Sequence, residues 1–308
     1  MKAVTYRRYG GPEVLEYGEV REPKIGPDCV LIHVKAAAVN PVDWKAQAGL
    51  LDPVLETVFP VIPGWDVAGV VERPGPAAPE FRTGDEVIGY SREDLLHRGT
   101  CAEYAAPHLR ALARKPRNLS FEEAAGIPLA GLTAYQALAK VLMVAEGETV
   151  LVHAAAGGVG SMAVQIARHL GARVIGTASE RNHDYLRGLG AEPVAYGEGL
   201  VDRARELAPD GVNAVFDLIG GEALAASARL LAPRGRLASI ADPAVIGLGG
   251  RYVFTQPDPE DLLYLTSLAE RGVLGVEIAA VFPLEETADA QLLSMEGHTR
   301  GKIAIKVR

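Results

Sequence analysis

The stretch that most constrains the fold is residues 150–168, where a run of aliphatic side chains ends in small residues and apolar positions return with helical spacing. This pattern predicts a strand, a tight turn and a helix in direct succession. Glycines let the backbone approach a ligand closely, and the start of a helix favours negative charge. Ala155 stands in the first glycine position of the dinucleotide fingerprint, with Gly157 and Gly160 in the other two. We expect a dinucleotide pyrophosphate at this turn; the alternative is a small-residue turn where the helix packs tightly on the strand.

The segments that follow this turn repeat the alternation of strand and helix. Strands are expected at 173–179, 193–196, 212–219 and 235–241, and helices at 182–189 and 222–231. Several parallel crossovers in sequence predict a doubly wound parallel sheet of the Rossmann type.

The composition excludes several classes of function. The formal net charge of −8 argues against nucleic acid as the main partner, because binding a phosphate backbone usually needs a basic face. Cys29 and Cys101 are too few for a disulfide framework or a multi-cysteine zinc site. The first residues contain no apolar signal-peptide core, and no later apolar run approaches the ~20 residues that span a bilayer. We expect a cytoplasmic protein with no membrane span.

The first part of the chain has a different character from the nucleotide-binding part. Its short candidate strands are separated by Gly and Pro clusters and lie at 2–6, 14–20, 29–39, 67–72 and 85–90. They predict a compact antiparallel or barrel-like domain. Ser120 and Glu123 form a capping-box pattern at the start of a helical region, and 301–307 has the pattern of a terminal strand. We therefore expect a first domain over 1–118, completed by 257–308, and a dinucleotide-binding domain over 119–256.

Several motifs, taken in order, resemble the quinone oxidoreductase branch of the medium-chain dehydrogenase/reductase superfamily. The resemblance covers nearly the whole chain and rests on segments 10–15, 39–45, 63–69, 128–134, 155–160 and 298–302. It implies a GroES-like β-rich catalytic domain, an inserted Rossmann domain, a nicotinamide cofactor in the cleft between them, and a homodimer.

The resemblance also identifies where this chain departs from the superfamily's zinc-dependent alcohol dehydrogenases. Asn40 occupies the place of the first cysteine ligand, and Trp65 occupies the place of the histidine before the acidic Asp66. An indole cannot ligate zinc, and one carboxylate falls short of the three protein ligands that a catalytic zinc needs. We expect no metal, and hydride transfer to acceptors that delocalise the incoming charge, such as quinones or double bonds conjugated to a carbonyl.

Candidate catalytic residues follow the expected strand at 29–39. Asn40 could hydrogen-bond a carbonyl or the nicotinamide ribose, while Asp43 and Lys45 could orient an oxygen or relay a proton. The alternative is that Asp43 caps the helix after Pro41 and that Lys45 is a solvated charge. Tyr90 and Tyr135 are further candidate proton donors or, alternatively, half-buried aromatic residues.

The choice of nicotinamide depends on the end of the second strand of the dinucleotide-binding domain. No acidic residue ends that strand; Ser179 and Arg181 could instead hold the 2′-phosphate of NADPH, although Glu180 adds a negative charge nearby. Thr133 is a phosphate contact by resemblance or, alternatively, a local hydrogen bond at a helix start. The expected cofactor-binding residues are Asn40, Thr133, Ala156, Gly157, Gly158, Val159, Gly160, Ser179, Arg181, Ile240 and Phe254.

The sequence thus predicts a zinc-independent NADPH-dependent reductase of quinone-like acceptors. One alternative is an enone or enal double-bond reductase, which usually needs a placed proton donor. Another is a cofactor-binding protein without turnover, of a crystallin-like or RNA-binding kind, which the acidic balance disfavours.

Overall fold

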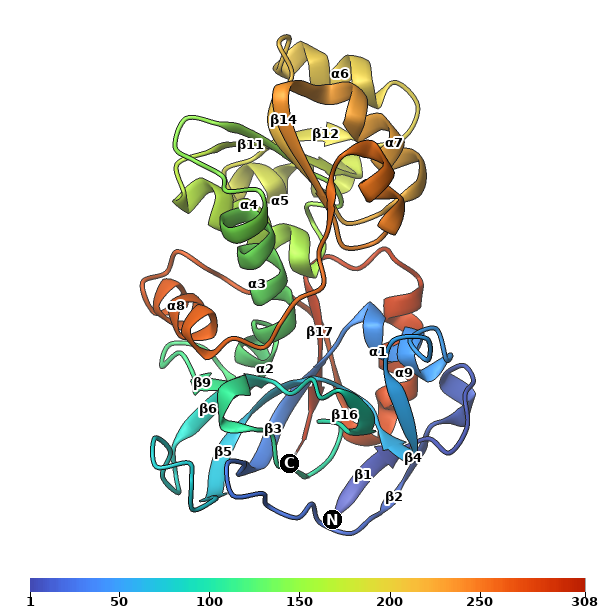
Figure 1. Cartoon of the computed structure of the whole chain (residues 1–308), viewed down its shortest axis with the longest axis vertical. Helices are drawn as coiled ribbons and strands as arrows, with labels where there is room; N and C mark the ends of the chain where they lie inside the picture. The colour runs from blue at the N-terminus through green and yellow to red at the C-terminus, as the bar shows by residue number, and fades with distance from the viewer. Residues whose placement is uncertain (308) are drawn as a thin grey trace. The chain divides into compact units, whose positions relative to one another are not determined.

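The computed structural model describes residues 1–307 (Figure 1). Its chain divides into two compact units. The first unit comprises Met1–Leu129, Pro257–Gly272 and Val276–Arg308, and the second comprises Ala130–Gln256 and Val273–Gly275. Among the described residues, no helix has the length and apolar character needed to cross a membrane.

The first unit is built on one mixed sheet whose strands lie in the order β16-β17-β3-β5-β6-β9, with β8 also paired to β3. The strands are β3 (Val30–Val39), β5 (Asp66–Pro74), β6 (Glu86–Tyr90), β8 (Tyr104–Ala105), β9 (Leu112–Arg114), β16 (Ile278–Pro283) and β17 (Lys302–Lys306). Two small sheets pair β1 (Lys2–Thr5) with β2 (Glu16–Glu19), and β4 (Glu56–Ile62) with β7 (Leu95–Arg98). The β-rich character predicted for this part is confirmed, although β4, β7, β8, β9 and β16 were not predicted.

Strand β3 is the centre of this unit. It pairs antiparallel with both β5 and β17, and its inward side chains Val30, Ile32 and Val34 are fully buried. Ile303 and Ile305 of β17 join the same apolar core. The prediction that the C-terminal segment returns to the first part of the chain as a strand is therefore confirmed.

Helices border the sheet of the first unit. They are α1 (Pro41–Gln47), α2 (Phe121–Ala125), α8 (Pro259–Glu270) and α9 (Thr287–Met295), and α3 (Pro128–Tyr135) begins in this unit. Ser120 and Glu123 do form the predicted capping box at the start of α2. Helix α2 packs against β3, β5 and β17, so the first unit extends to Leu129 and not to residue 118 as expected. The chain returns to the first unit at Pro257, but Val273–Gly275 within the expected 257–308 segment belong to the second unit.

The second unit contains a parallel sheet in the order β12-β11-β10-β13-β14-β15. Its strands are β10 (Thr149–Val152), β11 (Arg173–Ala178), β12 (Glu192–Ala195), β13 (Val212–Asp217), β14 (Leu231–Ser239) and β15 (Arg251–Tyr252). Its helices are α4 (Gly158–His169), α5 (His183–Gly188), α6 (Leu200–Leu207) and α7 (Gly221–Leu230). Two halves that diverge from β10 and β13 give the strand order typical of a Rossmann sheet, which confirms the predicted doubly wound fold.

Candidate functional site

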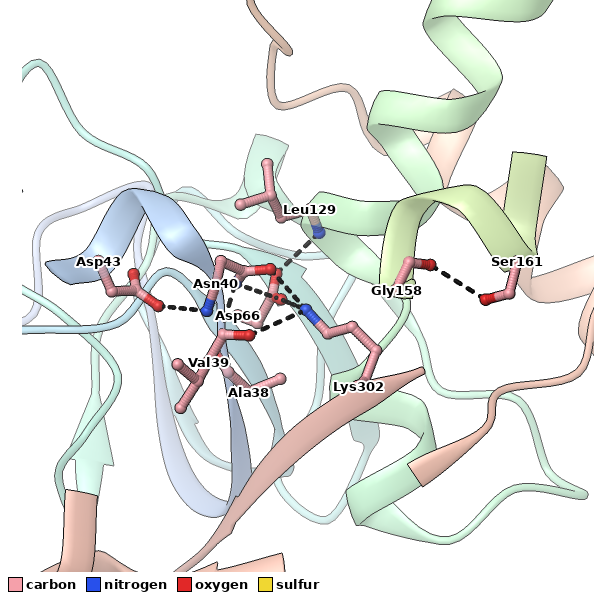
Figure 2. Close-up of polar contacts among 9 residues, drawn as sticks. All are labelled: Ala38, Val39, Asn40, Asp43, Asp66, Leu129, Gly158, Ser161 and Lys302. Atoms are coloured by element: carbon pink, nitrogen blue, oxygen red, sulfur yellow. Dashed lines mark hydrogen bonds and ion pairs between the residues drawn. The ribbon is translucent and has the colours of Figure 1, made fainter. Parts of the chain in front are cut away.

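The predicted glycine turn connects β10 to α4 in the second unit. Gly157 is the N-cap of α4, and the first helical hydrogen bond runs from the Ser161 N–H to the Gly157 carbonyl over 2.9 Å. The N–H groups of residues 158–160 therefore precede the intrahelical ladder, as in the first turn of any helix. Ser161 Oγ donates to the Gly158 carbonyl at 3.3 Å, within this turn (Figure 2).

The two glycines at the fingerprint positions differ in what surrounds them. A Cβ on Gly157 would meet only the Ala154 carbonyl, at 3.4 Å, which is ordinary contact. A Cβ on Gly160 would overlap that carbonyl and lie 2.7 Å from Ala155 Cα. Gly160 is thus required by the close packing of the helix on the turn, whereas Gly157 leaves an open approach to backbone N–H groups.

A buried polar network that was not predicted contacts the residues directly before the turn. Thr177 Oγ1 accepts from the Ala154 N–H at 3.1 Å and lies 3.3 Å from His153 Nδ1, while His153 Nε2 lies 2.8 Å from Ser227 Oγ. Burial lowers the pKa of His153. Ala154 has φ of +46°, the left-handed region, so the network holds a strained residue directly before the turn.

The candidates for the cofactor's extra phosphate follow β11. Ser179 is half-buried and precedes a 3₁₀ turn, Glu180–Asn182, in which Arg181 is exposed. Asn182 Nδ2 donates to Ser179 Oγ at 3.3 Å. A hydroxyl and a guanidinium therefore stand at the carboxyl end of the strand next to β10.

The remaining candidates of the second unit also lie near carboxyl ends of its strands. Ile240 directly follows β14, and its N–H donates to the Asp217 carbonyl at 3.2 Å. Thr133 Oγ1 lies 2.6 Å from Thr255 Oγ1, just after β15, where Phe254 is 42% exposed. Because parallel strands end at a common edge, these residues lie along the same edge as the glycine turn.

Asp217 belongs to this edge although the sequence did not single it out. Its carboxylate accepts from the Gly220 N–H at 3.0 Å and from Ser239 Oγ at 2.6 Å. Both Asp217 and Ser239 are fully buried, so they join the ends of β13 and β14. Their contacts are with the protein, which makes them a support for the edge.

A second polar cluster lies in the first unit, at one edge of its sheet. It contains Asn40, Asp66 and Lys302, and each of these side chains is buried (Figure 2). Asn40 follows the last residue of β3, whereas Asp66 and Lys302 are the first residues of β5 and β17. Because β3 runs antiparallel to both neighbours, its end meets their starts.

Hydrogen bonds within this cluster are extensive. Lys302 Nζ donates to Asn40 Oδ1 at 2.5 Å and to the Val39 carbonyl at 3.3 Å, and lies 3.4 Å from Asp66 Oδ2. Asn40 Nδ2 donates to Asp66 Oδ2 at 2.9 Å, and the Leu129 N–H donates to Asp66 Oδ1 at 2.7 Å. Burial raises the pKa of Asp66, and these donors oppose that effect.

Asp43 is connected to this cluster through Asn40. Its Oδ2 accepts from the Asn40 N–H at 2.7 Å, so the alternative prediction that Asp43 caps the helix after Pro41 is confirmed for that oxygen. Its Oδ1 is buried and has no hydrogen-bond partner in the described residues. Burial, reinforced by the Asp66 carboxylate and opposed by the Asn40 N–H and Lys302, raises the pKa of Asp43 to about 7.

Asp43 also lines a small hollow in the first unit. The hollow is bordered by Tyr6, Val61, Pro63, Trp65, Ser91 and Leu96. The buried Oδ1 of Asp43, unpartnered in the described residues, is unusual, because buried polar atoms are generally hydrogen-bonded.

The other candidates in this unit lie differently. Lys45 Nζ lies 5.5 Å from the ring centroid of Trp44 and is not among the contacts of the Asn40–Asp66–Lys302 cluster. Tyr90 is 1% exposed and packs edge-to-face on Trp65, with burial raising its pKa far above the usual value. The alternative interpretation of Tyr90 as a core aromatic fits this environment; Tyr135, in α3, is half-buried.

These residues do not fit a zinc ion. Asp66 already accepts hydrogen bonds from Asn40 and Leu129, and a lysine ammonium lies beside it. Trp65 supplies no lone pair, and no group of three or more His, Cys, Asp or Glu in residues 1–307 is arranged to hold a metal. Where a metal site would need ligands, this cluster contains the Lys302 ammonium.

Two family models match the chain, and curated relatives are similar over nearly its whole length. Residues 26–117 match the alcohol dehydrogenase GroES-like domain, and residues 158–276 match the family described as zinc-binding dehydrogenase. An NADPH-dependent alkenal/one oxidoreductase from Arabidopsis thaliana chloroplasts is 36% identical over 99% of this chain and 79% of its own length.

Two solved structures are similar over the whole length. A quinone oxidoreductase from Coxiella burnetii has a TM-score of 0.88 at 36% identity, covering 100% of this chain and 99% of its own. A protein described as an NAD-dependent alcohol dehydrogenase has a TM-score of 0.90 at 34% identity, covering 100% of both chains. The chain therefore belongs to the medium-chain dehydrogenase/reductase superfamily and is an oxidoreductase of its quinone oxidoreductase-like branch.

Proposed function

We propose that this protein transfers a hydride from NADPH to quinone-like acceptors without a metal. The observation that carries the proposal is the buried Lys302–Asp66 pair with Asn40, a cluster with no zinc ligand set, in a chain whose second unit has a Rossmann sheet and glycine turn. A superfamily member without a Lewis acid reduces most readily an acceptor that delocalises the incoming charge.

The cofactor would be held at the carboxyl edge of the second sheet. The N–H groups that open α4, with Ala156, Gly157, Gly158, Val159 and Gly160 around them, suit the pyrophosphate. Ser179 and Arg181 suit the 2′-phosphate, because a guanidinium makes charge-assisted, bidentate hydrogen bonds to such a group. Ile240, Phe254 and Thr133 lie further along the edge. When bound, the dihydronicotinamide supplies the hydride.

The acceptor would be oriented by residues of the first unit. Asp43 is the strongest candidate for a proton donor, because its Oδ1 is buried without a partner and burial raises its pKa to about 7. Both the nitrogen and the oxygen of the Asn40 side-chain amide are hydrogen-bonded within the cluster, so a structural role is the simpler interpretation of Asn40. Lys45 remains a candidate for orienting an oxygen.

A second candidate function is the reduction of alkenals and enones at the conjugated double bond. The same observation on Asp43 favours it, because hydride addition to such an acceptor leaves an enolate that needs a proton. The Arabidopsis relative bears such a name. We also propose a homodimer and a cytoplasmic location.

The test is an acceptor screen with purified protein. NADPH oxidation is followed with a quinone, an alkenal, an enone and no acceptor, and each active pair is repeated with NADH. The proposal expects turnover that depends on the acceptor and is faster with NADPH. Tight NADPH binding without turnover by any acceptor would instead favour the cofactor-binding protein without enzymatic activity.

A further inference from the structure

Lys302 is a buried cation to which the function proposed above assigns no step in the reaction. It opens β17 and is 4% exposed. Its ammonium has three N–H groups, and three protein oxygens surround it, on Asn40, Val39 and Asp66. Because these partners account for the donors, Lys302 acts on other residues of the protein and has no donor left for a substrate.

The first of those residues is Asn40. Its Oδ1 accepts from Lys302, and its Nδ2 donates to Asp66 and, at 3.3 Å, to the Ala38 carbonyl. Turning the amide over would place N–H groups against an ammonium and an oxygen against a carboxylate. The cation and the carboxylate therefore fix one orientation of the amide and, with it, the end of β3.

The second residue is Asp43, which Asn40 holds through its backbone. The Asn40 N–H donates to Asp43 Oδ2 over 2.7 Å, so the other oxygen, Oδ1, is directed away from this bond and is buried without a partner in the described residues. Asp43 is one of the residues that line the hollow bordered by Tyr6, Trp65 and Ser91. A protonated Asp43 carries its hydrogen on Oδ1, because Oδ2 is already an acceptor. Lys302, Asn40 and Asp43 thus form a continuous chain of contacts.

We propose that Lys302 is a positioning residue: together with Asp66 it holds Asn40 and, through Asn40, keeps Asp43 at the wall of the hollow with its Oδ1–H turned away from Asn40, as the proton donor to the reduced acceptor. This inference rests on the proposed function. The acceptor gains a hydride, with its two electrons, from the dihydronicotinamide and a proton from Asp43 Oδ1. Asp43 is left as a carboxylate, and water returns the proton.

The charges around Asp43 determine how this arrangement responds to pH. Lys302 stabilises the Asp43 carboxylate, and Asp66 opposes it. Tyr6, Tyr90 and Cys101 also interact with Asp43, and burial keeps them neutral around pH 7. Glu93, His97 and Arg98 line the same hollow as Asp43 and are present unchanged in every variant compared. Removing the Lys302 charge therefore raises the pH at which Asp43 loses its proton. When both charges of the Lys302–Asp66 pair are removed, their opposite effects on the pKa of Asp43 largely cancel.

The test compares Lys302→Met with a double variant, Lys302→Met/Asp66→Asn, which leaves no uncompensated charge if the single variant fails to fold. Lys306→Met is the matched control, because Lys306 lies on the same strand with its side chain 68% exposed, beside Glu122. For each protein, thermal unfolding reports folding, a titration gives the NADPH affinity, and kcat and KM are measured from pH 5 to 9. A ¹³C titration of the Asp43 carboxyl in the protein alone needs no turnover.

For Lys302→Met, we expect unchanged NADPH affinity and a kcat at least tenfold lower, with a smaller change in the KM for the acceptor. The alkaline limb of the pH profile of kcat should move to higher pH. The Asp43 carboxyl should titrate at higher pH too, and both values should return toward those of the wild type in the double variant. If neither the alkaline limb of the kcat profile nor the titration of the Asp43 carboxyl moves, the inference is overturned and Lys302 is a purely structural residue. If no acceptor is reduced by wild type, the proposed function fails, but the ¹³C titration still decides whether Lys302 acts on Asp43.

Discussion

Lys302 Nζ lies 3.4 Å from Asp66 Oδ2, and the two side chains are 4% and 0% exposed. Taking both charges out of water costs several kcal/mol per ion, so such a pair persists only with good geometry and additional hydrogen bonds. Asn40 and Leu129 provide those bonds. The pair lies where three strands of the first unit meet, and it is the observation on which the proposed metal-free reaction rests.

The stability of the pair can be tested separately from activity. We expect Lys302→Met to lower the free energy of unfolding by about 3–5 kcal/mol, because it leaves a buried carboxylate unpaired. The double variant Lys302→Met/Asp66→Asn should recover most of that loss. Denaturant unfolding of both proteins and of Lys306→Met measures this; equal losses in the single and double variants would contradict it.

The raised pKa of Asp43 predicts that the free energy of unfolding depends on pH. Its pKa is about 7 in the folded protein against 3.8 for the unperturbed group, so folding favours its protonated form. The stability it contributes is fully present below about pH 4 and is lost as pH rises to about 7. Between these pH values, the free energy of unfolding of Asp43→Asn should rise by roughly 4 kcal/mol relative to that of the wild type. Unfolding measured at pH 4, 5.5 and 7.5 checks the trend, and a constant difference between the two proteins would contradict it.

The two glycines of the turn should respond differently to substitution. Gly157→Val should fold, since a Cβ there meets only an ordinary contact, but should bind NADPH at least tenfold more weakly. Gly160→Ala should lower stability by about 1–3 kcal/mol through overpacking. Gly188→Val, in α5 with open space around it, is the control. Calorimetric titration and thermal unfolding provide the data; unchanged NADPH affinity in Gly157→Val would place the pyrophosphate elsewhere.

Arg181 should distinguish NADPH from NADH. A charge-assisted hydrogen bond contributes roughly 1.5–3 kcal/mol, so Arg181→Ala should weaken NADPH binding by about one to two powers of ten and leave NADH nearly unaffected. The control is Arg187→Ala, an exposed arginine paired with Asp184 on the following helix. Titrations with both cofactors give the result. Equal losses for NADH and NADPH would mean that Arg181 supports the shape of the loop.

Much of the fold follows from local patterns in the sequence. Alternating and continuous aliphatic runs identified β3, β5, β6 and the strands from β10 to β14. The strands that were missed are short or poorly buried: β15 has two residues, and β4 is largely exposed with Pro60 inside it. The missed helix α6 starts after Gly199, a residue in the left-handed region, and its strongly charged sequence resembles a loop.

The candidate site was predicted less completely, for a physical reason. Asn40 and Asp43 were identified because they lie in the segment 39–45, which carries the resemblance and directly follows a predictable strand. Lys302 was recognised as part of a strand and of the segment 298–302 that carries the resemblance, but not as a site residue. Its partner Asn40 lies 262 positions earlier, and only the pairing of β3 with β17 brings the two together. The burial of a charge depends on such long-range packing, which periodicity does not report.

The central claim is tested most directly by turnover of protein that has been treated with a chelator and shown by elemental analysis to hold no zinc. The account predicts that this protein oxidises NADPH with a quinone or a conjugated carbonyl acceptor at the same rate as untreated protein, and that added zinc brings no increase. One tightly held zinc per chain, or activity that is lost on chelation and restored by zinc, would contradict it.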